Sequence, residues 1–323
     1  MLIANNLRKE YIQREKNGWL KKKKTIKVAV DDISLEIKPN QIVGLLGING
    51  SGKTTTIKML TNMITPTSGR IFIDNQEINK NNRHFKNQIS LISGGEKGLY
   101  YRLTGRENLE YFGSLYGLSG NLLNERVNAC LKIVSLTDNA DYKVESYSKG
   151  MKQRLQIARG LINDPKYLFL DEPTLGLDII VAKEMRDYVK KLVNETNKSL
   201  LLTTHYIYEA EELCDYIYII NKGKLIRQGT AQEIKLSSNA KFNIGFVVKE
   251  VNQDFLNHLR NKKSIERVIT NSSENTIEII SNVNVMNEII NDGKVYDIEF
   301  LGFSTSEPTL EESLEKILTD GSN

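Results

Sequence analysis

Residues 41–56 decide the fold of this chain, and they read Gln-Ile-Val-Gly-Leu-Leu-Gly-Ile-Asn-Gly-Ser-Gly-Lys-Thr-Thr-Thr. The apolar run at 42–46 predicts a buried strand, and residues 47–54 fit the pattern G-x-x-x-x-G-K-[ST] of a phosphate-binding loop. Glycines let backbone N–H groups crowd around a polyphosphate at positions where a Cβ atom would obstruct it. A helix that begins near Gly52 would direct its positive end at the same anion. The stretch therefore predicts a nucleoside triphosphate site between a strand and a helix.

Individual residues of this loop have different predicted roles in nucleotide binding. Lys53 is long enough to reach the β- and γ-phosphates, and the hydroxyl of Thr54 is a suitable ligand for Mg²⁺. The residues expected to surround the phosphates are Gly47, Ile48, Asn49, Gly50, Ser51, Gly52, Lys53, Thr54 and Thr55. Such a loop indicates a nucleoside triphosphate as ligand, but it does not indicate what the energy is used for.

The composition allows one large domain and a smaller one. The chain has 323 residues, of which 40% are apolar, enough for a sizeable core. It contains no run of about 18 apolar residues that would cross a membrane, and residues 1–6 lack the apolar centre of a signal peptide. Cys130 and Cys214 are isolated, without the spacing of a metal site or a disulfide framework. We therefore expect a reducing, cytosolic environment.

The net charge changes sign along the chain. Residues 241–323 hold 8 Lys and Arg against 14 Asp and Glu, a net charge of −6, while the whole chain carries +4, so residues 1–240 carry +10. This shift and a linker-like stretch at 230–240 predict a boundary between a domain at 1–235 and a small accessory domain at 241–323. The acidic second domain also argues against a nucleic-acid partner, which requires a basic surface.

The accessory domain has a predicted fold of its own. Its pattern of strand, helix, strand, strand, helix and strand predicts an α+β ferredoxin-like fold. The last of these strands is expected at 295–300. No constellation of catalytic residues stands out in this part of the chain.

The N-terminal region predicts a small antiparallel layer. Apolar and polar residues alternate at 1–7 and at 33–37, as in strands with one buried face. Between them, the segment 12–25 contains four consecutive lysines at 21–24. A lysine run is typical of a solvated loop, which we expect here. The alternative is a patch that rests on an anionic membrane surface, where each lysine contributes about 1 kcal/mol.

Helix signals follow the first strands. Residues 97–146 are expected to be mostly helical, and Thr104 with Glu107 three residues later is a capping box that marks a helix start. Ser148 is expected to cap the N-terminus of another helix, 149–162, whose apolar residues recur at helical spacing. These helices predict a helical subdomain beside the sheet.

Three predicted strands end in residues that suit phosphate chemistry. One strand ends in the phosphate-binding loop, the apolar run at 167–170 is followed by Asp171 and Glu172, and the run at 199–203 is followed closely by His205. Because open α/β sheets bind ligands at the carboxyl ends of their strands, we expect these groups to converge on one site.

Each of these side chains has an expected role and a plainer alternative. Asp171, after four apolar residues, suits the acidic partner of Mg²⁺, which it would contact through a water molecule. Glu172 would polarise a water molecule for in-line attack on the γ-phosphate, and His205 would bind that phosphate. Alternatively, Glu172 is a surface carboxylate and His205 has a structural partner. Lys53, Glu172 and His205 are the predicted catalytic residues.

With these motifs the chain resembles the nucleotide-binding subunit of an ATP-binding cassette (ABC) transporter over about residues 1–232. Residues 147–154, Tyr-Ser-Lys-Gly-Met-Lys-Gln-Arg, are similar to the family signature, usually Leu-Ser-Gly-Gly-Gln. Residues 171–178 resemble the Walker B and D-loop run, and residues 204–205 resemble the switch histidine. The resemblance implies an α/β fold, a P-loop NTPase core with an antiparallel β layer and a helical subdomain. It also implies an ATPase that uses ATP and Mg²⁺.

The resemblance further implies a second nucleotide-binding subunit, identical or different, with ATP held between the two. Ser148 and Gly150 lie where a helix begins, so their polar groups suit an anion, and in the family this anion is the γ-phosphate held by the other cassette. Asp178 would lie at the seam between the cassettes. Tyr11 matches the aromatic residue that stacks on adenine.

Two features depart from the family pattern. The family has a glutamine that contacts Mg²⁺ and the attacking water after the strand that ends near Ile92, but the chain has Gly94 there. Either Thr54, Asp171 and water hold the metal alone, or Glu96 substitutes. The segment 12–25 also looks inserted after Tyr11.

Two further stretches resemble one particular branch of the ABC family. Residues 98–109 and 307–314 resemble cassette subunits of bacterial ABC-2-type exporters of drugs and peptides. This implies an integral membrane permease on another chain, docked on residues 97–118, and a peripheral position on the cytoplasmic face of a bacterial membrane. Two alternatives stay open: a soluble ABC ATPase that acts on ribosomes or DNA, and a regulatory cassette that hydrolyses ATP weakly because of Gly94.

Overall fold

The computed structural model describes residues 1–17, 21–78, 83–93, 98–237, 242–271, 274–306 and 309–320. The chain forms two compact units, Met1–Ala231 and Gln232–Asn323. We describe each unit by itself. Among the helices in the described ranges, none is both long and apolar enough to cross a membrane.

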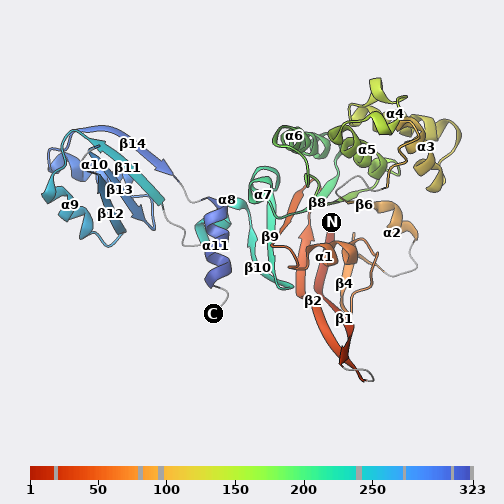
Figure 1. Ribbon diagram of the computed structural model, residues 1–323, viewed down its shortest axis with the longest axis horizontal. Helices are drawn as coiled ribbons and strands as arrows, with labels where there is room; N and C mark the ends of the chain where they lie inside the picture. Colours follow the sequence, from red (N-terminus) through yellow and green to blue (C-terminus); the bar gives the residue numbers. More distant parts are fainter. Residues whose placement is uncertain are drawn as a thin grey trace. The chain divides into compact units, whose positions relative to one another are not determined.

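A six-stranded sheet forms the centre of the first unit (Figure 1). Five of its strands run parallel, and the edge strand β10 is antiparallel to β9. The strands are, in sheet order, β10 (Lys224–Gly229), β9 (Tyr216–Asn221), β3 (Ile42–Leu46), β8 (Ser199–Thr204), β7 (Tyr167–Asp171) and β6 (Ile89–Ser93). This order places the carboxyl ends of β3, β8 and β7 next to one another.

Apolar cores lie on both faces of this sheet, because successive strand residues point to opposite sides. Leu200 and Leu202 of β8 pack in one core and Leu201 packs in the other. All three side chains are fully buried, which explains why β8 is a continuous apolar run. The first core includes residues of the helices α3 (Gly105–Leu115), α4 (Gly120–Ile133), α5 (Lys149–Leu161), α6 (Ile179–Thr196) and α7 (Ile207–Leu213).

The second core joins the sheet to an antiparallel layer. It contains residues of α1 (Lys53–Leu60) and α2 (Arg83–Gln88) and of the layer strands. The layer has the order β2-β1-β4-β5, formed by β2 (Lys21–Ile37), β1 (Leu2–Asn17), β4 (Ser68–Ile73) and β5 (Gln76–Glu77). The predicted antiparallel layer is therefore present.

The expected loop at 21–24 is wrong, because these residues belong to β2. Strands β1 and β2 pair from Leu2↔Ile37 as far as Asn17↔Lys21, whereas β4 pairs with β1 only over its first residues. Figure 1 shows the two strands running on as a ribbon beyond β4. A ladder that starts in the buried layer extends outward because each added pair forms further backbone hydrogen bonds. The segment 12–25 is thus an extension of a hairpin; residues 18–20, with Trp19, lie outside the described residues.

The helices α3 and α5 begin at the capping residues that the sequence predicts. The Thr104 side chain accepts a hydrogen bond from the Glu107 N–H and the Glu107 carboxylate accepts one from the Thr104 N–H, so the capping box is confirmed. Ser148 Oγ accepts a hydrogen bond of 3.2 Å from the Met151 N–H at the start of α5. Two short 3₁₀ helices, Thr137–Asn139 and Val144–Ser146, precede it.

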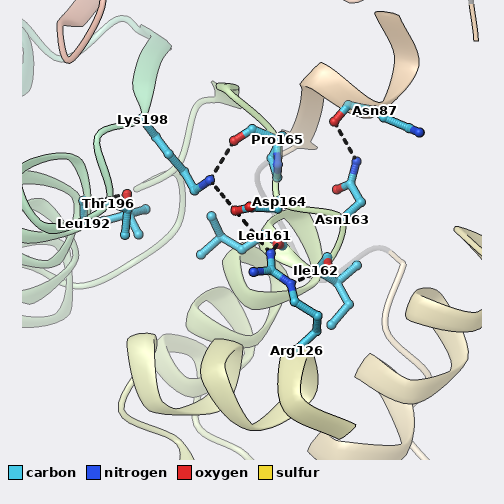
Figure 2. Close-up of polar contacts among 10 residues, drawn as sticks. All are labelled: Asn87, Arg126, Leu161, Ile162, Asn163, Asp164, Pro165, Leu192, Thr196 and Lys198. Carbon is cyan, nitrogen blue, oxygen red and sulfur yellow. Dashed lines mark hydrogen bonds and ion pairs between the residues drawn. The ribbon is translucent and has the colours of Figure 1, made fainter. Parts of the chain in front are cut away.

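A polar cluster ties the helices to the sheet at the end of α5 (Figure 2). Lys198, just before β8, donates hydrogen bonds of 2.8 Å to Asp164 Oδ1 and to the carbonyl of Pro165. Arg126 of α4 lies 3.2 Å from the same carboxylate oxygen and donates to the carbonyl oxygens of Leu161 and Ile162. One carboxylate therefore links α4, the turn after α5 and the strand β8.

The second unit has the predicted order of elements. They are β11 (Phe242–Val248), α9 (Gln253–Arg260), β12 (Ile265–Asn271), β13 (Thr276–Ser281), α10 (Met286–Val295), β14 (Phe300–Ser306) and α11 (Leu310–Asp320). The sheet order is β12-β13-β11-β14 and every neighbouring pair is antiparallel. Its apolar core is separate from the two cores of the first unit.

One expectation for this region is wrong. The strand predicted at 295–300 lies at Phe300–Ser306, because α10 continues to Val295 and Asp297 then takes a left-handed turn, with φ of 54°. The boundary between the two units, after Ala231, falls inside the linker-like stretch at 230–240, which also contains the helix α8 (Ala231–Ser237).

Candidate active site

The phosphate-binding loop joins β3 to α1 and packs against neighbouring backbone. A Cβ atom on Gly47 would lie 2.3 Å from the Ile220 carbonyl oxygen, and one on Gly52 would lie 2.7 Å from the Ala29 carbonyl oxygen. Gly52 also has φ of 112°, in the left-handed region that glycine tolerates. The glycines are therefore required by close packing as well as by the turn.

Lys53 begins α1 and bends back beneath this loop. Its ammonium donates hydrogen bonds to the carbonyl oxygens of Gly47, at 2.7 Å, and Ile48, at 3.3 Å. Lys53 is only 5% exposed. Burial lowers its pKa below the ordinary value of 10.5, and the nearby carboxylates of Glu172 and Asp171 offset this only in part. The charge is held at the loop, where a phosphate group would pair with it.

Two acids follow each other at the carboxyl end of β7. Asp171 is the last residue of the strand, and Glu172 has φ of 53°, a left-handed conformation that ends the alternation of the strand. The hydroxyl of Thr203, on the neighbouring strand β8, donates a hydrogen bond of 2.6 Å to Asp171 Oδ1. The Glu172 N–H donates to Thr203 Oγ1 and to the Thr203 carbonyl oxygen, both at 3.1 Å. Sequence reasoning missed Thr203, although a hydroxyl ending an apolar strand beside these acids was a usable signal.

Glu172 lies between the other two predicted catalytic residues. Its Oε1 is 4.0 Å from Lys53 Nζ and 3.4 Å from His205 Nδ1. The three side chains come from the ends of β3, β7 and β8, so the strand order brings them together. The Glu172 side chain is 22% exposed, so it is partly buried beside these two residues. The imidazole of His205 packs on Tyr206, with ring centroids 4.1 Å apart.

A cavity of about 580 Å³ opens beside this group. Its lining includes Asn49, Gly50, Thr54 and Thr55 of the phosphate-binding loop and its helix, together with Glu172. Tyr11 of β1 is also part of the lining. The Lys9 ammonium lies 5.5 Å from the Tyr11 ring centroid and donates a hydrogen bond of 2.7 Å to the Thr65 carbonyl oxygen. The cavity therefore has a polar phosphate end and an aromatic wall.

Ser148, Gly150 and Asp178 do not line this cavity. Ser148 caps α5, and Asp178 caps α6 by accepting a hydrogen bond of 2.9 Å from the Val181 N–H. Gly150 packs against α6, since a Cβ atom there would lie 2.8 Å from Val181 Cγ1. Ser148 and Asp178 are exposed. A single chain does not bring these residues to Lys53.

The oxygen donors of the site suit a hard divalent cation. Thr54 offers an exposed hydroxyl beside the cavity, and Asp171 offers a carboxylate already held by Thr203. Among the described residues, no cluster of three or more His, Cys, Asp or Glu that could hold a metal ion is present. A Mg²⁺ ion would therefore depend on phosphate and water oxygens for its remaining ligands. Gly94 and Glu96 lie outside the described residues.

Comparison with known proteins identifies the family of the chain. Residues 30–175 match the family model described as ABC transporter. The chain is 39% identical to the ABC transporter ATP-binding protein NatA of Bacillus subtilis over 68% of this chain and 89% of the relative. It is 34% identical to the linearmycin resistance ATP-binding protein LnrL of Bacillus subtilis over 96% of each chain.

Solved structures agree with the fold. The chain is similar to the dimeric ATP-binding cassette MJ0796 in a post-hydrolysis state with ADP and Pi, at 28% identity and a TM-score of 0.60 over 71% of this chain and 98% of that one. It is also similar in fold to cbiO1 of Clostridium perfringens, at 24% identity and a TM-score of 0.63 over 72% of this chain and 89% of that one.

Proposed function

This chain belongs to the ATP-binding cassette (ABC) transporter family, and on that premise we propose that it powers export through a separate membrane permease of the ABC-2 type. It is an ATPase whose family relatives are ATP-binding subunits of transporters. The observation that carries the proposal is the position of Glu172, 4.0 Å from Lys53 Nζ and 3.4 Å from His205 Nδ1 at one edge of the cavity.

The residues of the cavity divide the chemistry among them. The loop N–H groups and Lys53 hold the triphosphate, with Lys53 leaving its carbonyl partners for the β- and γ-phosphates. Glu172 accepts a proton from the water that attacks the γ-phosphorus, while the bond to the β-phosphate oxygen breaks and ADP leaves. His205 holds the γ-phosphate in line. Bound Mg²⁺, held by Thr54 and Asp171, would neutralise phosphate charge.

A second cassette completes the site in this proposal. Ser148 and Gly150, at the start of α5, supply anion-binding groups to the γ-phosphate of the partner, and Asp178 lies at the seam. Ile179 and Ile180 support this assignment, because they are 87% and 73% exposed beside Asp178. Exposed isoleucines next to a signature helix are costly unless another surface covers them.

An exposed aromatic patch supports a membrane partner. Tyr100, Tyr111, Leu115 and Tyr116 are all more than two-fifths exposed in or beside α3. Tyr100 and Tyr111 pack edge to face, with centroids 4.9 Å apart, so the patch is preformed. We assign the permease contact to this surface, and we propose that the protein lies on the cytoplasmic face of a bacterial membrane.

The direction of transport is inferred from named relatives. The relatives include proteins named for linearmycin resistance, daunorubicin resistance, bacitracin transport and Nod factor export. We infer export as the activity that this chain powers. These names favour transport over the alternative of a soluble ATPase on ribosomes or DNA. We further propose that residues 241–323 form a separate accessory domain, since that part of the chain has a core of its own.

The proposal is tested with the full chain and Mg²⁺-ATP. Glu172→Gln is expected to lower phosphate release by a factor of about 100 or more, to retain ATP binding and to accumulate an ATP-bound dimer in gel filtration. Lys53→Ala is the control, expected to lose ATP binding and the dimer. Unchanged turnover in the Glu172→Gln protein would remove this residue from the catalytic role. Recovery of the native protein with ribosomes or DNA alone, without a membrane protein, would overturn the export proposal.

A further inference from the structure

The extended hairpin presents two different faces. In the register of β1 and β2, Tyr11 pairs with Lys27, Ile12 with Ile26, and Gln13 with Thr25. Tyr11, Gln13 and Lys27 all line the nucleotide cavity. Ile12 and Ile26, from the alternating positions, are 69% and 66% exposed and are not part of that lining. At these pairs one face of the hairpin is therefore a wall of the site, and further along β2 the lining continues through Val28 and Ala29.

The spacing along β1 places Gln13 next to anything that stacks on Tyr11. Residues i and i+2 of a strand lie on one face, about 7 Å apart, which is close to the width of a purine. The Tyr11 ring is held on one side by the Lys9 ammonium. A base that stacks on Tyr11 is therefore within reach of the Gln13 amide.

A glutamine amide complements the edge of adenine. The amide oxygen accepts a hydrogen bond from the 6-amino group, while the amide N–H donates to the adjacent ring nitrogen. Lys27, the cross-strand neighbour of Tyr11, adds an ammonium to the same cavity, as do Lys53 and Lys222. Against these three cations the lining contains the carboxylate of Glu172, so the cavity favours a polyanion.

We propose that this hairpin face recognises the adenine nucleotide: Gln13 hydrogen-bonds the 6-amino group of the base, and Lys27 attracts the polyphosphate. The inference rests on the nucleotide site of the proposed function and adds two residues to it. Gln13 comes from the segment 12–25 that the sequence presents as an insertion, and Lys27 follows that segment on β2. The strand register brings both residues into the cavity.

The test compares ATP with purine riboside triphosphate, which lacks the 6-amino group. Equilibrium binding to the full chain is measured in EDTA, which prevents turnover, by displacement of a fluorescent ATP analogue. The wild type is expected to bind ATP about fivefold or more tightly than the analogue that lacks the amino group. Gln13→Ala is expected to bind the two with equal affinity. Ile12→Ala, next along the strand on the other face, is the matched control and should keep the preference.

The substitution Lys27→Ala is expected to change nucleotide affinity in a different way. Lys27→Ala is expected to weaken both nucleotides about equally, and the loss should shrink as salt screens the charge. If Gln13→Ala keeps the wild-type preference, or if Lys27→Ala binds both nucleotides like the wild type, the inference is wrong. If Lys53→Ala loses all nucleotide binding in the same experiments, only the inference about Gln13 and Lys27 fails and the proposed function stands. If Lys53→Ala binds nucleotide like the wild type, the proposed function itself is wrong.

Discussion

Thr203 and Asp171 are joined across two neighbouring strands by a hydrogen bond of 2.6 Å, donated by the threonine hydroxyl to Asp171 Oδ1. The same hydroxyl oxygen accepts the N–H of Glu172 at 3.1 Å. Thr203 is fully buried, so this hydroxyl fixes the carboxylate of Asp171, the proposed metal ligand, together with the backbone of Glu172, the proposed general base.

Replacing Thr203 by valine is expected to impair turnover more than nucleotide binding. The substitution keeps the shape but removes a hydrogen bond to a charged group, worth about 1.5–3 kcal/mol, which corresponds to a fall in kcat of about tenfold or more. Steady-state phosphate release measures kcat, and Kd for ATP is measured in parallel. Thr61→Val is the control, because Thr61 Oγ1 donates only to carbonyl oxygens of its own helix turn. A wild-type kcat for Thr203→Val would contradict this role.

Gly150→Ala is expected to strain the contact between α5 and α6. The added Cβ would approach Val181 Cγ1 to 2.8 Å, and such overpacking costs about 1–3 kcal/mol. Thermal or urea unfolding should show the loss of stability. The double variant Gly150→Ala with Val181→Ala should recover most of it, because the space then becomes available. A second substitution that restores nothing would show that Gly150 is required for another reason.

Asp164 is expected to make stability depend on pH at the acidic end. Burial raises the pKa of Asp164, but the hydrogen bond and charge of Lys198 and the charge of Arg126 outweigh it, so the pKa lies below the ordinary 3.8. A lowered carboxyl pKa stabilises the folded state above the unfolded pKa, and this contribution is lost as the pH falls through the folded value. Figure 2 shows the cluster.

The substitution Asp164→Asn tests this. Asparagine also tolerates the left-handed backbone at this position, where φ is 54°. The carboxylate is 64% exposed, so solvent screening limits the loss at pH 7 to about 1 kcal/mol or less. Urea unfolding should show this difference shrinking from pH 7 toward pH 3. In a double-mutant cycle with Lys198→Met, the losses in free energy of unfolding caused by the two substitutions should not add. If they add, the interaction between Asp164 and Lys198 does not stabilise the protein.

Ile179→Asp is expected to prevent dimer closure without preventing ATP binding. Ile179 is exposed on a single chain, and a charge buried at an interface without a partner is strongly unfavourable. In the Glu172→Gln background, gel filtration with ATP should then show a monomer, while Kd for ATP in the monomer stays near its usual value. Ile26→Asp serves as the control, because Ile26 is another exposed isoleucine, 66% exposed on the hairpin against 87% for Ile179. A dimer that forms normally with Ile179→Asp would exclude this residue from the seam.

Several parts of the fold could be predicted because their causes are local. The capping box at Thr104 and the cap at Ser148 involve side chains and N–H groups three residues apart. The apolar run of β8 reports burial on both faces. Other parts could not be predicted. Residues 21–24 form a strand because they pair with β1 across the hairpin. Four consecutive lysines carry no apolar alternation, so the sequence pattern does not predict this strand.

The sequence alone determined the phosphate-binding loop with its glycines, and it determined the acids and the histidine that follow two later strands. Each of these features depends on a few neighbouring residues and on backbone sterics. The separations of 4.0 Å and 3.4 Å that join Glu172 to Lys53 and His205 were not readable in that way. Neither was the placement of Gln13 and Lys27 in the cavity. These depend on which strands lie side by side and in which register, and that is settled by packing and hydrogen bonding among segments far apart in the sequence.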